Sequence, residues 1–172
     1  MKHIDDIDWE KVPEERLVEV LRLAELKLDA QLQGTFARDQ RASSLISTYT
    51  TIASALVGGL VALYFSESIN ILLFIIGLLP VAGFVVSVFM SLQVLHSSRF
   101  NYPGNDPMSW SREDFTHPWS QVLAEQAQAY RDMILENEEV AEKDSGSLIL
   151  ATKTATISFS AAAVWALVAV LV

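Results

Sequence analysis

The chain has 172 residues, of which 51% are hydrophobic, and its formal net charge is −9. It contains no cysteine, which excludes a disulfide framework and any Cys-ligated metal site. Twenty of the 21 acidic residues lie in residues 1–43 or 99–144, the exception being Glu67. These acidic segments argue against polybasic docking on nucleic acid or on a lipid surface, so we expect no nucleic-acid partner.

Three long stretches with few or no charges divide the chain. Residues 45–65 and 69–98 contain no Asp, Glu, Lys or Arg, and residues 145–172 carry only Lys153. A helix rises ~1.5 Å per residue and a bilayer core of ~30 Å needs ~20 apolar residues, so each stretch is long enough to span. The first 40 residues lack the pattern of a cleaved signal peptide, so we expect the first stretch to be an uncleaved anchor.

The second stretch is the strongest candidate span. Residues 71–92 include 15 Leu, Ile, Val or Phe, which at roughly −0.3 to −0.6 kcal/mol each gives an upper bound of about −5 to −9 kcal/mol for insertion. The first stretch is diluted by Ser and Thr, and the third carries Lys153, whose stem can reach back to the interface. Both are expected to insert as members of a bundle. The alternative is a soluble, all-helical protein that buries all three stretches.

The distribution of cations predicts the orientation. Residues 1–43 contain seven Lys or Arg and residues 99–144 contain four, whereas the 66–70 turn has none. The positive-inside rule therefore places the N-terminus and the 95–148 segment in the cytoplasm and the C-terminus outside. We expect a multi-pass protein of the bacterial inner membrane whose direct partner is the lipid bilayer.

An amphipathic helix is predicted before the first span. Pro13 followed by Glu14 and Glu15 is typical of a helix start. An apolar stripe then recurs at intervals of three and four residues: Leu17, Val20, Leu21, Ala24, Leu28 and Leu32. Because only Gly34 weakens the pattern, we expect one helix that runs from the cytoplasm into the membrane.

A second amphipathic stripe follows Pro118. Its members are Trp119, Val122, Leu123, Gln126, Tyr130, Met133, Asn137 and Val140. It can pair with the first stripe, parallel or antiparallel, within one chain, or it can pack between subunits. The sequence thus predicts an all-α fold of three transmembrane helices with a cytoplasmic helical platform. Its segments are an N-terminal helix (1–43), a transmembrane hairpin (44–98), an aromatic loop and helix (99–148) and a third span (149–172).

An aromatic loop separates the second span from the second stripe. Pro-Gly and Asn-Asp-Pro in this loop are turn formers. Interfacial Trp and Tyr favour headgroup depth, so the loop can lie as a lid against the inner membrane face. It can instead be a recognition or interface loop, for which the candidate residues are Tyr102, Pro103, Gly104, Asn105 and Trp110.

The sequence carries little catalytic chemistry. His3, His96 and His117 are scattered without metal-ligand spacing, and there is no Gly-rich phosphate loop or Gly-x-Ser-x-Gly elbow. Among Asp, Glu, Lys and Arg, only Lys153 lies within the spans, which disfavours a proton-coupled transporter. We therefore expect no enzyme, no catalytic residue, no metal site and no cofactor.

Small and hydroxylated residues recur every four positions in two of the spans. Such residues let helices approach closely, and their hydroxyls can bond between helices for ~0.6–2 kcal/mol. This pattern allows packing inside one three-helix bundle or self-association into an oligomer, whose hydroxyl-lined seams could form a pore. The candidate helix-packing or oligomer face comprises Ser47, Thr51, Ala55, Gly59, Thr154, Ser158 and Ala162.

A short motif precedes the first span, in which Asp39 is followed closely by Arg41 and Ala42. Together with the three-span layout, this motif resembles the small bacterial membrane proteins of the Pycsar-effector transmembrane and SLATT type. The resemblance implies an executioner of an anti-phage or conflict system, triggered by a cyclic nucleotide or an associated protein. It also makes Asp39 and Arg41 candidate signal-relay residues.

The leading functional prediction is a non-enzymatic inner-membrane effector that oligomerises and perturbs or permeabilises the membrane on a cytoplasmic signal. A phage holin would share the size, the hydroxyl-rich spans and the oligomerisation, but would act on a timer without a ligand. An accessory or scaffold subunit would bind a larger membrane complex through its stripes and loop.

Overall fold

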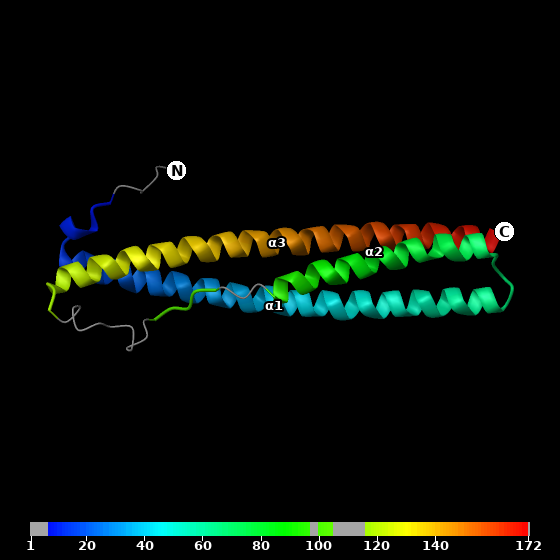
Figure 1. Cartoon of the computed structure of the whole chain (residues 1–172), viewed down its shortest axis with the longest axis horizontal. Coiled ribbons are helices and arrows are strands. Elements are labelled where there is room, and N and C mark those ends of the chain that lie inside the picture. Colours follow the sequence, from blue (N-terminus) through cyan, green and yellow to red (C-terminus); the bar gives the residue numbers. More distant parts are fainter. Residues whose placement is uncertain (1–6, 97–99, 105–115, 172) are drawn as a thin grey trace. The chain divides into compact units, whose positions relative to one another are not determined.

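The computed structural model describes residues 7–96, 100–104 and 116–171. Every regular element within them is a helix, as predicted: η1 (Trp9–Lys11), α1 (Glu14–Phe65), α2 (Ile71–Leu95) and α3 (Trp119–Leu171) (Figure 1). The all-α fold and the three long apolar helices are therefore confirmed.

The ends of α1 follow from local chemistry. The helix begins at Glu14, and the N–H groups of Arg16 and Leu17 donate to the Pro13 carbonyl at 2.9 and 3.1 Å. At its other end the Ser68 N–H donates to the Leu63 oxygen at 3.1 Å, while Glu67 has a φ of 57°. This is the Schellman type of helix end, with Glu67 in the left-handed position that usually holds glycine.

The next helix, α2, begins one turn later on a side-chain cap. The Asn70 Oδ1 accepts a hydrogen bond from the Leu73 N–H at 2.9 Å, which satisfies a backbone donor at the helix start. A tight turn therefore joins α1 to α2, as expected for a transmembrane hairpin.

The amphipathic helix after Pro118 and the third apolar stretch form one helix rather than two segments. α3 runs unbroken over 53 residues through Gly146, where a side chain would meet open space. Glycine only weakens a helix, and no proline interrupts the sequence between Trp119 and Leu171.

The chain divides into two compact units. Unit 1 comprises Met1–Thr35 and Arg99–Ala141, and unit 2 comprises Phe36–Ser98 and Glu142–Val172. Both α1 and α3 therefore begin in unit 1 and end in unit 2, whereas α2 belongs to unit 2 alone.

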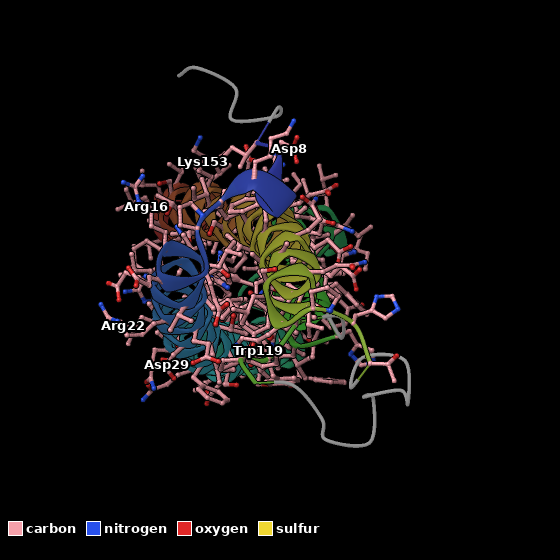
Figure 2. The ribbon with its side chains drawn as sticks, turned by 90° about the vertical axis from the view of Figure 1, so that its left-hand side faces the viewer. Asp8, Arg16, Arg22, Asp29, Trp119 and Lys153 are labelled. Carbon is pink, nitrogen blue, oxygen red and sulfur yellow. The ribbon has the colours of Figure 1, made fainter. Side chains whose placement is uncertain are left out.

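The two predicted stripes pack against each other in unit 1. The buried core consists of Leu17, Leu21, Leu28, Leu123, Ala124, Ala127 and Tyr130. Glu25 contacts Tyr130 and Gln31 contacts Asn137, so α1 and α3 run parallel within one chain (Figure 1). Arg16, Arg22 and Asp29 project from the side of α1 that faces away from α3 (Figure 2). Trp119 departs from the prediction, since it is half exposed.

Unit 2 is a three-helix assembly in which α2 runs antiparallel to its neighbours. Tyr49 of α1 packs on Phe84 of α2 with ring centroids 6.0 Å apart, and the indole Nε1 of Trp165 in α3 donates to the Leu73 oxygen at 2.9 Å. The buried face of α2 comprises Gly77, Pro80, Val81, Phe84, Ser87, Ser91 and Val94.

The outer surface of unit 2 is apolar. In the most apolar windows of α1, α2 and α3, only 17%, 28% and 11% of the residues are buried. Phe89, Ile157 and Leu167 are each more than 60% exposed. A soluble helical protein would bury such side chains, and large exposed apolar areas mark surfaces that meet lipid or protein. All three helices are long and apolar enough to cross a membrane, so the chain is a multi-pass membrane protein.

Candidate functional site

A buried amide lies at the centre of the polar contacts in unit 1. Asn137 is fully buried, and its Nδ2 donates to the Asn101 oxygen at 2.9 Å and to the Gln31 Oε1 at 3.2 Å. Its Oδ1 accepts from the Asn101 N–H at 2.8 Å. Gln31 in turn donates to the Ile134 oxygen at 3.1 Å. Asn137 therefore fixes the start of the loop and the register of α1 against α3.

Two further polar contacts join the same helices. The Tyr130 hydroxyl donates to Glu25 at 3.3 Å, and Lys27 pairs with Glu138 at 2.9 Å. Burial, and then the charge of Glu25, raise the pKa of Tyr130. The Lys27–Glu138 pair is half exposed, and such pairs contribute only ~0–1 kcal/mol. The seam is thus fixed mainly by its apolar core and by Asn137.

The candidate loop is described at its first residues only. Tyr102 is 65% exposed, Pro103 is half-buried, and Gly104 is exposed with a φ of 97°. Asn105 and Trp110 lie outside the described residues. Asn101, held by Asn137, anchors this segment to unit 1, while Tyr102 is presented outward.

The predicted small-residue face differs between the two spans. On α1, Ser47, Thr51, Ala55 and Gly59 are exposed, and a side chain added at Gly59 would meet nothing within 4 Å. On α3, Thr154 and Ala162 are half-buried, and Ser158 is buried at 5% exposure. The face on α3 is therefore used inside the chain, whereas the face on α1 has no partner among the described residues.

Hydroxyls of both small-residue faces donate hydrogen bonds within their own helices. Thr51 donates to the Ser47 oxygen and Ser158 donates to the Thr154 oxygen, each at 2.9 Å and each within its own helix. Ser87 and Ser91 in α2 do the same at 2.9 and 3.0 Å. Without water, a hydroxyl in lipid finds its nearest acceptor on its own backbone, four residues back.

Close approach at two glycines of α2 holds unit 2 together instead. A Cβ at Gly83 would collide with Ser158, and one at Gly77 would collide with Leu60 and lie 2.9 Å from Trp165. Small residues at such crossings let helices pack tightly in lipid. Both glycines belong to the Gly-Leu-Leu-Pro-Val-Ala-Gly run of residues 77–83, but this run does not identify the residues that they meet.

The two candidate relay residues lie on α1 in unit 2. Asp39 is half-buried, Arg41 is exposed, and Ala42 of the same motif is fully buried. Arg41 lines a cavity between α1 and α3, together with Arg38 and with Lys153 of α3. Sequence reasoning did not foresee this convergence, because it depends on the parallel register of α1 and α3.

The described residues contain no group of three or more His, Asp or Glu side chains that could hold a metal ion. Comparison of the chain with protein families, with characterised proteins and with solved structures gives no match. A functional assignment therefore has to come from the residues and the geometry of the chain.

Proposed function

We propose that this chain is a non-enzymatic effector of the bacterial inner membrane, which oligomerises and permeabilises the membrane on a cytoplasmic signal. The observation that carries the proposal is the continuity of α1 and α3, which extend over 52 and 53 residues from charged into uncharged sequence. Unit 1 would receive the signal, a cyclic nucleotide or a protein, and unit 2 would act on the membrane in an anti-phage or conflict response.

Continuous helices supply the physical link in this proposal. Sliding between packed helices is a common way in which proteins switch state. Because no turn separates the unit 1 part of α1 from its apolar part, a shift at the seam around Gln31 and Asn137 would be passed along the helix. A flexible connection would absorb the same shift.

The proposed orientation places unit 1 in the cytoplasm. Residues 1–43 and 99–144 hold 11 of the 12 Lys and Arg residues, and the 66–70 turn holds none. The positive-inside rule favours the cytoplasm for the cation-bearing segments and the outside for the turn and the C-terminus.

Two exposed surfaces support self-association. In unit 2 the outward face of α1 carries Ser47, Thr51, Ala55 and Gly59, the residue types that pack between helices in lipid. In unit 1, Val18, Leu23 and Leu26 are each about half exposed. Exposed apolar side chains on a water-facing surface are typical of protein interfaces.

The test follows the membrane potential of cells that express the chain, with a voltage-sensitive dye, before and after phage infection. Inverted membrane vesicles receive cyclic mononucleotides as candidate signals. We expect depolarisation only after a signal. Spontaneous depolarisation would instead indicate a holin. The absence of depolarisation under every condition would indicate an accessory subunit.

Gln31→Pro tests the link within α1. A proline in a helix interior costs ~3 kcal/mol or more, so depolarisation should be lost while membrane insertion persists. Gln31→Ala removes the same side-chain bonds but keeps the helix, and Glu14→Pro introduces proline at the first helical position, where it is tolerated. Full activity of Gln31→Pro would reject the link, as would equal losses in all three variants.

A further inference from the structure

A cavity opens between α1 and α3 of unit 2, where both helices enter their uncharged stretches. Its volume is about 860 Å³, within the range of about 300–1,000 Å³ that small-molecule sites occupy. Arg41 lies four residues before the first uncharged stretch, and Lys153 lies eight residues inside the third. At a rise of ~1.5 Å per residue, Arg41 therefore lies just before the start of the uncharged part of α1, and Lys153 lies just after the start of the uncharged part of α3.

Three cations and no acid line this cavity. The cations are Arg38, Arg41 and Lys153, and no acidic residue is among the described lining residues. The carboxylates of Asp39 and Asp144, close to them in sequence, do not line it. Arg38 and the buried Asp144 each have an interaction partner, so the charge offered to an occupant is that of Arg41 and Lys153, and in a chain of net charge −9 it favours an anionic occupant.

The donors that we assign to that occupant are the cationic groups of Arg41 and Lys153, since Arg38 already has an interaction partner. Thr152 and Thr156 also line the cavity, but their hydroxyls donate to the Leu148 and Thr152 oxygens at 2.9 Å each. Guanidinium groups bind phosphate oxygens through paired N–H donors, and the Lys153 ammonium adds a point charge. The Lys153 side chain points outward from α3 (Figure 2).

The rest of the lining is apolar and open to the surroundings. Ile149 and Ile157 are 56% and 71% exposed, and Leu45 is half-buried. A soluble phosphate compound would leave these side chains uncovered, whereas an acyl chain beneath a phosphate would cover them.

We propose that this cavity is a binding site for an anionic phospholipid. The phosphate lies between Arg41 and Lys153, and an acyl chain lies on Ile149 and Ile157. Basic pockets between transmembrane helices bind lipid headgroups in this way. The site differs from a polybasic surface patch, because its charges come from two helices that line one cavity. It depends on insertion in a membrane and is independent of the proposed effector activity.

The test uses the full chain, purified in mild detergent and analysed by native mass spectrometry. Equal amounts of phosphatidylglycerol and phosphatidylcholine with the same acyl chains are added. We expect wild type to retain one phosphatidylglycerol with at least tenfold preference. The double variant Arg41→Gln with Lys153→Gln should lose that preference. The control, Arg16→Gln with Lys143→Gln, removes two exposed cations that do not line the cavity and should retain it.

Three results would overturn the proposal. First, wild type could show no preference for phosphatidylglycerol. This result comes from wild type alone, so it does not depend on whether a variant folds. The two double variants could lose the preference equally, which would indicate bulk charge. Millimolar glycerol phosphate or adenosine monophosphate could displace the bound lipid, which would indicate a site for a soluble phosphate compound. Circular dichroism and size-exclusion chromatography establish that each variant is folded.

Discussion

The two units of this chain hold their helices together by different means. In unit 1 polar side chains reach across the seam, as Gln31, Asn137 and Glu25 show. In unit 2 the described hydroxyls of Ser87, Ser91 and Ser158 bond back to their own helices, and the helices approach closely at Gly77 and Gly83. A hydrogen bond from the Trp165 indole to the Leu73 oxygen also joins α3 to α2.

This difference is the one that we expect if unit 1 meets water and unit 2 meets lipid, as in the proposed orientation. In water, apolar burial drives the two stripes of unit 1 together, and a buried amide then fixes their register. In lipid, apolar side chains gain nothing by leaving their surroundings, so close packing of small residues has to replace the hydrophobic effect. Variants can test whether each unit depends on its own mechanism.

Asn137→Ala should have the largest effect, confined to unit 1. It leaves the Asn101 N–H, the Asn101 carbonyl and the Gln31 Oε1 without the partner that Asn137 provides. Each buried polar group without a partner costs about 1–3 kcal/mol, so we expect a loss of about 3 kcal/mol. Hydrogen–deuterium exchange in detergent should show faster exchange in residues 14–35 and 119–141, with residues 71–95 unchanged.

The matched control for this variant is Glu139→Ala, an exposed position two residues away on the same helix. Its effect should stay within about 0.5 kcal/mol. If Asn137→Ala changed exchange equally in α2, the contrast between the two units would be wrong.

Gly83→Ala should destabilise unit 2 by about 1–3 kcal/mol, because its Cβ would collide with Ser158 in a packed crossing. Gly146→Ala meets open space and removes a weak helix residue, so it should stabilise by up to about 1 kcal/mol. Thermal unfolding of the monomer in detergent, followed by circular dichroism, compares the two.

The Ser158→Ala background identifies the clash. In it, Gly83→Ala should cost less, because the Ser158 oxygen is gone, although the Cβ contact at 3.1 Å remains. Equal costs in both backgrounds would show that the helices do not meet at this point.

Local rules sufficed to predict the helices but not their partners. Pro13 and the acids after it placed the start of α1, and the two stripes gave most of the buried core of unit 1. They missed Ala124 and Ala127 and wrongly included Trp119. The sequence pattern left open whether these stripes run parallel, since periodicity along one helix holds no information about direction. The Asn101–Asn137 and Leu73–Trp165 contacts span 36 and 92 residues and have no local signature.

The candidate site shows the same limit. Asp39 and Arg41 were selected through a family resemblance, and Lys153 only as an isolated charge in a span. That Arg41 and Lys153 line one cavity follows from the parallel register of α1 and α3, which only the three-dimensional arrangement supplies.

The smallest expected effect is a pH dependence that belongs to unit 1. Burial and the Glu25 charge raise the pKa of Tyr130 above its ordinary value of about 10. A raised pKa in the folded state means that the stabilising contribution is complete below the unfolded-state value. It is lost as the pH rises through the folded-state value.

Tyr130→Phe should therefore be slightly less stable than wild type at pH 8.5, by about 0.5–1.5 kcal/mol for the lost hydrogen bond. The difference in stability between wild type and Tyr130→Phe should narrow by pH 11. At that pH wild type loses the stabilising contribution of the protonated Tyr130 hydroxyl, which the variant lacks at every pH. Thermal unfolding at the two pH values measures the gap, and Tyr102→Phe, at an exposed tyrosine of the same unit, should show no such change. A gap that widened with pH would reverse the sign of the argument and remove Tyr130 from the polar contacts that stabilise unit 1.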